Sequence, residues 1–467
     1  MSADEFDLVI RKGRIVLPDR VIAGDVGVTG GRIAAIGPEL AGNGRAEVDA
    51  SGLVVMAGMI DTHVHLRDPG HPQRENFATG TAAAAKGGIT TVLEMPSGIP
   101  AVADAESWRH KLALVAPKAH VDFGLYGGAG ASNLDRIAEQ AAVGAIAFKS
   151  FMIPPGPLSD PGIESRSLAD DVSFLRAMRE IRAAERVAVV HAENGGLCAH
   201  FAAEQRARGR NDLQAHADSR PPITEVEAVS RAIVLGAEAA VRLSFAHVST
   251  RGAVEQIRRA KASGLTVTAE ACPHHLLLGT SERPALGPFG KINPPLRDRE
   301  HREALWAGLL DGTIDFIGTD HAPYTAADKE PGWASIWDAP AGGHGLETAL
   351  AVLLTQVAGG RLTLPQLTRI VSLNAAKVFG LHPRKGELRP GADADLILVD
   401  TERAAEFSAE SSVSVSRDGA RLWEGYPTIG AVLATYVRGE LVMRDGDIVG
   451  PRGFGRLVTA ERSARPA

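Results

Sequence analysis

The 467-residue sequence contains little cysteine, few aromatic residues and no long apolar run. Its two cysteines, Cys198 and Cys272, cannot form a disulfide framework, which favours a reducing compartment or indifference to redox. No stretch approaches the ~18 apolar residues of a membrane span. The acidic N-terminus, MSADEFDLVI, lacks the apolar core of a signal peptide. We therefore expect a soluble, cytoplasmic protein with no membrane partner.

Basic residues are also in the minority, because the formal net charge is −6. Such a chain has no basic footprint for nucleic acid, so we expect no nucleic-acid partner. The hydrophobic content of 45% and charged content of 23% are ordinary for a globular enzyme. The length fits a barrel of about 250 residues or more with a smaller domain beside it.

The middle of the chain alternates between strand and helix patterns, which is typical of a parallel α/β sheet. Thr224 to Glu227 form a capping-box pattern that predicts the start of a long helix. Eight strand candidates occur, at 53–60, 88–94, 120–126, 144–149, 186–192, 241–247, 264–270 and 313–319. Eight β/α units predict a TIM (β/α)8 barrel.

Both ends of the chain are instead rich in short strand patterns. The N-terminal candidates are 6–10, 14–17, 25–28 and 32–36, with a hairpin signal at Gly30-Gly31. A helical stretch at 345–380 precedes the C-terminal candidates, 396–399 and 431–437. We predict that residues 1–56 and 385–450 form one small β-sandwich domain beside a catalytic barrel of residues 57–384. The tail, 451–467, is expected to be extended or mobile.

His63 and His65 lie one residue apart at the end of the first strand candidate. Residues i and i+2 of a strand face the same side, so both imidazoles can reach one metal ion. Taken alone, the pair is better explained as two unrelated loop histidines. However, potential ligands also end four later strands of the predicted barrel, where chemistry is located in this fold: Lys149, His191, His247 and Asp320. Together they favour a site for zinc or a similar divalent ion.

Lys149 differs from the others, because an ammonium group cannot ligate a cation. It follows the apolar stretch Ala145 to Phe148, where desolvation favours the neutral amine. A neutral amine can react with carbon dioxide to give a carbamate, whose two oxygens can bridge two metals. The alternative is a surface lysine at a strand end.

Several motifs resemble the cyclic amidohydrolases of the amidohydrolase superfamily, a group that contains dihydroorotase, allantoinase and the hydantoinases with dihydropyrimidinase. They are DTHVHLRDPG, GAIAFKSFM, VVHAEN, FAHVST, KINPPLR, FIGTDHAP, HGLETAL and KGELRPGADADLIL. The resemblance extends from about residue 5 to 450, with the motifs in the family's order. It is more specific for the group than for any one member.

The resemblance implies a centre of two divalent metal ions, usually Zn²⁺, with Mn²⁺ or Co²⁺ as alternatives. One metal would be held by His63, His65 and Asp320, the other by His191 and His247, with Lys149 bridging after carboxylation by carbon dioxide. Asp320 would be catalytic, taking a proton from water and delivering it to the leaving ring nitrogen. The reaction would open a cyclic amide to a carbamoyl or ureido acid. Relatives are commonly homodimers or homotetramers.

The choice of substrate depends on residues where the sequence departs from particular members. Arg67 matches the arginine with which dihydroorotase binds its substrate carboxylate, although it could instead pair with Asp68. Two other dihydroorotase positions are changed, to Ser97 and Tyr324, and the dihydropyrimidinase tyrosine is replaced by Pro154. We therefore rank a hydantoinase- or allantoinase-type hydrolase of cyclic ureides ahead of dihydroorotase.

Asn293 is our candidate for recognising the ring amide, because its side chain both donates and accepts. Its alternative role is that of a turn residue before two prolines. His321 is a further candidate for substrate contact, with Arg67, Ser97 and Tyr324. Three loops should set specificity for the ring substituent, at 68–76, 153–167 and 324–344.

Two other classes remain open. A non-catalytic scaffold with the same fold would be expected to lack metal ligands, and all six ligand positions are present here. A mononuclear deaminase would not require Lys149.

Overall fold

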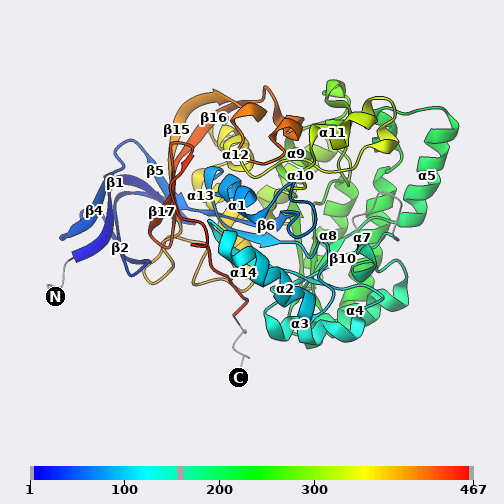
Figure 1. Cartoon of the computed structure of the whole chain (residues 1–467), viewed down its shortest axis with the longest axis horizontal. Coiled ribbons are helices and arrows are strands. Elements are labelled where there is room, and N and C mark those ends of the chain that lie inside the picture. Colours follow the sequence, from blue (N-terminus) through cyan, green and yellow to red (C-terminus); the bar gives the residue numbers. More distant parts are fainter. Residues whose placement is uncertain (1–4, 155–161, 462–467) are drawn as a thin grey trace.

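The structure is a computed structural model that describes residues 5–154 and 162–461. Its larger part is a closed barrel of eight parallel strands surrounded by helices (Figure 1). The barrel strands are β6 (Met59–Val64), β7 (Ile89–Glu94), β8 (Asp122–Leu125) with its continuation β9 (Gly127–Gly128), β10 (Phe148–Phe151), β11 (Val187–His191), β12 (Arg242–Phe245), β13 (Val267–Ala271) and β14 (Phe316–Ile317). A parallel bridge between Val64 and His321 closes the ring. The predicted TIM barrel is confirmed.

The first barrel strand differs from the predicted 53–60. Val54–Ala57 form a separate strand, β5, which pairs with the outer sheet, and the barrel begins only at Met59. Gly58 separates them, and a Cβ there would approach the Thr90 side chain to 2.2 Å. Both segments are apolar, so hydropathy could not reveal that the chain changes sheet at this glycine.

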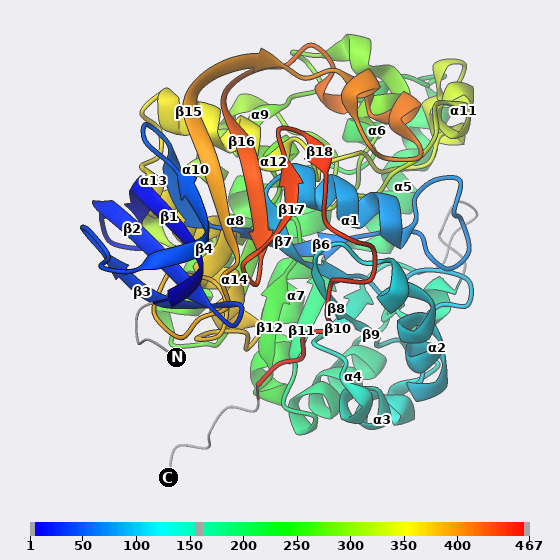
Figure 2. The same ribbon diagram turned by 60° about the vertical axis from the view of Figure 1, so that its left-hand side comes forward.

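The β-rich part is one nine-stranded sheet that combines both ends of the chain (Figure 2). Its strands are β1 (Glu5–Val16), β2 (Val21–Thr29), β3 (Arg32–Gly37), β4 (Asn43–Asp49), β5, β15 (Leu396–Glu406), β16 (Pro427–Val437), β17 (Glu440–Arg444) and β18 (Asp447–Ile448). The two halves meet where β5 pairs antiparallel with β15. The predicted strands 6–10 and 14–17 are one strand, β1, with an irregularity between Ile10 and Gly13. The domain boundaries themselves stay a prediction.

Helices cover the barrel, and α5 and α6 follow strand β11. The main helices are α1 (Phe77–Lys86), α2 (Ala105–Val115), α3 (Ile137–Val143), α4 (Asp171–Ala183), α5 (Gly195–Ala207), α6 (Leu213–Asp218), α7 (Pro222–Ala239), α8 (Arg251–Ala262), α9 (Pro273–Leu277), α10 (Arg299–Asp311), α11 (Ala326–Lys329), α12 (Ala349–Ala358), α13 (Leu364–Thr368) and α14 (Asn374–Val378). None of the described helices has both the length and the apolar character needed to cross a membrane.

The predicted capping box at Thr224 is wrong. Helix α7 starts two residues earlier, with Pro222 in the first helical position, where a missing N–H costs nothing. The Glu225 carboxylate accepts hydrogen bonds from the backbone N–H groups of Ser249 and Thr250, at 3.0 Å each. Glu225 therefore fixes the loop after β12. Glu227, the acid of the predicted box, contacts Asn194 and Arg231 instead of capping the start of its own helix.

The C-terminal segment is not a free tail over its described part. The Phe123 N–H donates to the Arg456 carbonyl at 3.0 Å, and the Val458 N–H donates to the Phe123 carbonyl at 2.7 Å. Val458 is buried among apolar residues. Residues 455–458 therefore extend the edge of β8, while residues 462–467 lie outside the described part of the chain.

A buried ion network joins the barrel to the nine-stranded sheet. The Lys385 ammonium lies 2.7 Å from Asp122 on β8, 3.3 Å from Asp393 and 2.5 Å from Asp395, just before β15. Arg438 also pairs with Asp122. Although these three carboxylates have the spacing of a metal site, three cations already neutralise them, because Arg384 also pairs with Asp393 at 2.9 Å. We interpret the cluster as structural.

Candidate metal centre and substrate pocket

His63, His65 and Asp320 converge at the carboxyl ends of β6 and β14. Asp320 Oδ1 lies 3.2 Å from His63 Nε2 and 3.5 Å from His65 Nε2. Zinc–nitrogen bonds are about 2.0–2.1 Å, so neighbouring ligand atoms around a tetrahedral zinc lie roughly 3.3 Å apart. The three atoms therefore have the spacing of ligands to one ion.

His191 and His247 form a second pair at the ends of β11 and β12. His191 Nδ1 lies 2.9 Å from His247 Nε2, and both side chains are buried. A hydrogen bond between these two nitrogens needs a proton on one of them, whereas a shared metal ion would use the lone pairs of both. This spacing also fits two ligands of one cation.

Lys149, on β10, is completely buried, and its ammonium nitrogen has no hydrogen-bond partner among the described residues. Burial lowers its pKa to about 8, although Asp320 and Glu270 favour the charged form. The Lys149 charge in turn helps to lower the pKa of His65, His191 and His247, so it acts on both histidine pairs. The neutral, reactive form of this amine is therefore more populated than that of an ordinary lysine.

Two of these residues have backbone conformations that side chains rarely adopt. The φ angle is +47° at Asp320 and +36° at His247. Non-glycine residues in this region carry a conformational cost, which the surrounding structure must offset. Such positions are concentrated at functional sites, and here both aim a candidate ligand inward.

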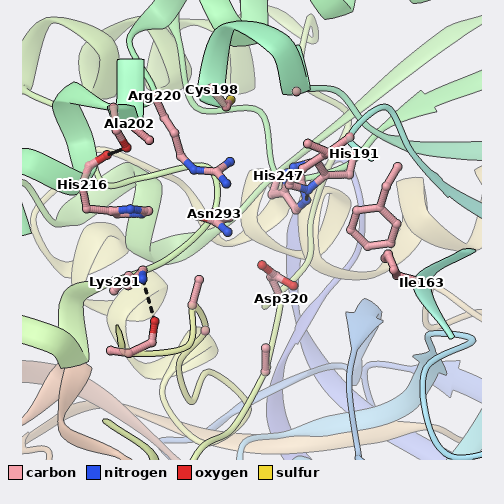
Figure 3. Close-up of a pocket in the computed structure, with 18 of the residues that line it drawn as sticks. Ile163, His191, Cys198, Ala202, His216, Arg220, His247, Lys291, Asn293 and Asp320 are labelled. Carbon is pink, nitrogen blue, oxygen red and sulfur yellow. Dashed lines mark hydrogen bonds between the residues drawn. The ribbon is translucent and has the colours of Figure 1, made fainter. Parts of the chain in front are cut away.

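A pocket of about 520 Å³ opens onto the histidines (Figure 3). Asp320 points into it, opposite His191 and His247. The wall also contains Arg67, Asn293 and Tyr324, together with apolar side chains such as Phe151 and Ile163. A concave, largely apolar pocket with a few convergent polar groups is the usual form of a small-molecule site.

The sequence matches the model of the "Amidohydrolase family" over residues 54–442. The chain belongs to the amidohydrolase family. An L-hydantoinase of Paenarthrobacter aurescens is 36% identical to it over 97% of this chain and 98% of its own length. An allantoinase of Salmonella newport (strain SL254) is 34% identical, covering 96% and 98%.

Solved structures agree with this assignment. The L-hydantoinase (dihydropyrimidinase) from Arthrobacter aurescens superimposes with a TM-score of 0.93 at 36% identity, covering 97% of this chain and 100% of its own. A D-hydantoinase structure gives a TM-score of 0.90 at 28% identity, covering 98% and 99%. The predicted family and its class, hydrolases of cyclic amides, are confirmed.

Three of the five predicted substrate contacts of this amidohydrolase line the pocket. They are Arg67, Asn293 and Tyr324, and the Arg67 guanidinium stacks over the Tyr324 ring at 4.7 Å. Asn293 Oδ1 is buried without a hydrogen-bond partner in the described part of the structure. Asp68, suggested as an ion-pair partner of Arg67, pairs with Lys118 at 2.5 Å.

The other two predicted contacts, Ser97 and His321, are not among the pocket-lining residues. Ser97 Oγ lies 3.2 Å from His65 Nδ1, so it orients the ring of a candidate ligand. His321 Nδ1 accepts a hydrogen bond from the Gly345 N–H at 3.2 Å, and its Nε2 lies 3.6 Å from Glu75. Both side chains therefore lie behind the candidate ligands rather than in front of them.

Two buried carboxylates next to the histidines were missed. Glu270, on β13, lies 2.9 Å from His63 Nδ1, and Glu193 lies 2.8 Å from His191 Nε2. Arg220 pairs with Glu193, and this ion pair holds the Glu193 pKa near 2 despite burial. Such carboxylates fix the tautomer and orientation of metal-binding histidines. The i, i+2 spacing of His191 and Glu193 could have indicated this contact from the sequence, whereas no sequence pattern linked Glu270 to His63.

The predicted specificity loops adjoin the pocket to different extents. Loop 324–344 supplies Tyr324, Trp337, Ala339, Ala341 and Gly342 to its wall. Of loop 153–167, residues Ile153, Pro154 and Ile163 line it, while residues 155–161 lie outside the described part of the chain. No residue of loop 68–76 is among the lining residues.

Proposed function

We propose that this amidohydrolase opens the ring of a cyclic ureide by metal-dependent hydrolysis of a ring amide bond, as a hydantoinase or allantoinase. The observation that carries the proposal is the buried amine of Lys149, which has no hydrogen-bond partner in the described ranges and whose charge acts on both histidine pairs. A bridging carbamate would replace this isolated charge by two oxygens that face two cations. A mononuclear deaminase or a scaffold gives no reason to bury an amine here.

The residues present fit two divalent cations. His63, His65 and Asp320 would hold one, His191 and His247 the other, and carboxylated Lys149 would bridge them; we favour Zn²⁺, with Mn²⁺ or Co²⁺ as alternatives. When bound, the cations lower the pKa of water and polarise a carbonyl oxygen. Glu270 and Glu193 keep the protons of His63 and His191 on the ring nitrogens that face away from the cations.

The remaining steps belong to the side chains that face the pocket. Asp320 accepts a proton from the attacking water and delivers it to the ring nitrogen that leaves. The Asn293 Oδ1 atom accepts a hydrogen bond from a ring N–H, which satisfies an otherwise unpartnered buried acceptor. Arg67, held against Tyr324, lies at the pocket wall, where it can contact a carbonyl oxygen or an acidic group of the substrate.

Rates on a panel of cyclic substrates test the proposal. Zinc- or manganese-loaded protein should be compared on allantoin, 5-substituted hydantoins, dihydrouracil and dihydroorotate, with release of the ureido acid measured. Hydantoins or allantoin should give the highest kcat/KM. Carbon-13 NMR of protein grown with labelled bicarbonate should show a lysine carbamate that is absent from the Lys149→Met variant. Absence of hydrolysis by metal-loaded protein would refute the proposal.

Dihydroorotase is the second candidate, because Arg67 does face the pocket. Ser97, however, binds His65 and not the pocket, and Tyr324 places an aromatic ring under Arg67. Only one of the three expected carboxylate contacts is therefore available. A kcat/KM that is highest for dihydroorotate would reverse our ranking. A cytoplasmic homodimer or homotetramer remains part of the proposal.

A further inference from the structure

The pocket extends beyond the candidate metal ligands into a second compartment. We call this the side arm and define it by Ala202, Arg206, His216, Arg220, Lys291 and Trp337, all of which line the pocket. Figure 3 shows Arg220 and Asn293 between the His191–His247 pair and the more distant His216 and Lys291. A ring bound at the candidate metal ligands would therefore direct one substituent past Asn293 into the side arm.

Three cations surround the side arm, and the acidic groups nearby leave it with an excess of positive charge. The Lys291 ammonium donates to the carbonyls of Ile336 and Ala339, at 2.7 and 2.6 Å, and forms no ion pair with a carboxylate of the described residues. Arg220 pairs with Glu193, which also binds His191. Asp338, which acts on Lys291, is exposed to solvent.

The cations of the side arm also repel one another. Burial, Arg220 and Arg206 together lower the pKa of Lys291 to about 8, whereas Asp338 opposes them. Among the described residues that line the pocket, Asp320 is the sole carboxylate, and it belongs to the candidate metal centre. An anion in the side arm would relieve this repulsion.

Arg206 is exposed to solvent, lines the pocket and presents a preformed contact for such an anion. Its guanidinium stacks over the Trp337 ring at 4.6 Å, and the Trp337 indole N–H is anchored to the Arg210 carbonyl at 3.0 Å. Within the ranges 5–154 and 162–461, Arg206 makes no hydrogen bond or ion pair through its five N–H donors. A guanidinium held flat on an aromatic ring offers its edge to a planar carboxylate.

We propose that the side arm binds a carboxylate at the end of the ring substituent, so that the preferred substrates are cyclic ureides with a carboxyalkyl side chain. This inference rests on the proposed function, because it concerns the substituent of the ring that is opened. Arg206 provides the planar contact, and Arg220 and Lys291 provide the surrounding positive charge. The apolar walls at Ala202 and Trp337 accommodate the methylene groups.

Two compounds of nearly equal shape separate charge from size. The enzyme should be assayed on 5-(2-carboxyethyl)hydantoin and on its neutral isostere, 5-(2-carbamoylethyl)hydantoin. We expect kcat/KM to favour the carboxylate by about tenfold, mainly through KM, as for a charged contact that binds ground and transition states alike. Arg206→Gln should lower that ratio about fivefold. The matched control is Arg208→Gln: Arg208 is the C-cap of α5 and is exposed like Arg206, but it does not line the pocket, so the ratio should stay unchanged.

Each alternative outcome has a defined meaning. A wild-type ratio at or below one, or a ratio that Arg206→Gln does not change, would overturn the inference. Hydrolysis of allantoin or unsubstituted hydantoin but of neither test compound would overturn it as well, while the proposed function survives. If no cyclic ureide is hydrolysed, both the proposed function and this inference are refuted.

Discussion

Glu270 provides the sharpest test of the candidate metal centre, because one buried carboxylate organises three groups. Its Oε1 accepts from His63 Nδ1 at 2.9 Å and from the His247 N–H at 3.0 Å, and its Oε2 accepts from Thr62 Oγ1 at 2.7 Å. It therefore touches one residue from each of the two histidine pairs. We predict that Glu270 controls metal affinity although it ligates no metal itself.

The expected magnitude follows from those three contacts. Glu270→Ala leaves three buried donors unpaired at about 1–3 kcal/mol each, or roughly 3–9 kcal/mol in total. That loss is comparable to the whole stability of a typical domain, about 5–15 kcal/mol, so this variant should fold poorly. Glu270→Gln keeps a carbonyl oxygen for His63 and His247 and turns its NH₂ group towards the Thr62 oxygen. It should fold well but bind zinc about 10–100-fold more weakly, because the charge on the orienting group is lost.

Zinc affinity should be measured by competition with a chelator, together with the free energy of unfolding of the metal-free protein in urea. Glu238→Gln is the matched control, because Glu238 is exposed and pairs only with Arg179 at 3.4 Å among the described residues. If Glu270→Gln retained wild-type zinc affinity, the orienting role would be refuted. The same conclusion would follow if Glu270→Ala were as stable as the wild type.

Three further predictions concern buried lysines. Lys149→Met should lower kcat/KM about 100-fold or more. It should not lower the urea midpoint, because the amine that it removes has no hydrogen-bond partner among the described residues. A variant that is less stable but fully active would contradict this prediction. Lys385→Met should cost about 3–5 kcal/mol in urea unfolding, because it leaves three buried carboxylates short of a cation, whereas the exposed Lys377→Met should be neutral. The Lys291 pKa is lowered from 10.5 in the unfolded chain to about 8 in the folded protein. Between pH 8 and 10.5 the unfolded chain therefore binds more protons, and the free energy of unfolding should rise with pH by up to about 3 kcal/mol. Urea unfolding at pH 8 and pH 10 should show this gain over Lys291→Met, and equal pH slopes in both proteins would exclude it.

The fold could be predicted wherever the local sequence pattern reflects how that segment packs in the folded protein. Alternating apolar strands and amphipathic helices are typical of a parallel sheet covered by helices, so periodicity predicted the barrel. The pattern failed at Gly58, where two apolar strands of different sheets are separated by one residue. It also failed at Val458, which becomes buried only because β8 offers an unpaired edge. Both failures depend on neighbours that are distant in sequence.

The candidate ligands were predictable for a related reason. Parallel strands bring their carboxyl ends together, so residues such as His63 and Asp320 could be grouped by their position in each β/α unit. Glu270 gave no such signal, because an acidic residue within a strand pattern does not reveal which ring nitrogen it will face. Ser97 and His321 have the right sequence positions, but their side chains turn behind the ligands.

Ring chemistry and substituent recognition are located on different parts of this fold. The candidate ligands come from the ends of barrel strands, whose geometry the closed sheet fixes. The side arm comes from α5, α6 and the loops after β13 and β14, which contribute Arg206, His216, Lys291 and Trp337. Identities of 36% to an L-hydantoinase and 34% to an allantoinase therefore support the same ring-opening reaction without selecting one substrate. If this separation is correct, exchanging Arg206 should change which hydantoin is preferred while leaving zinc affinity at its wild-type value.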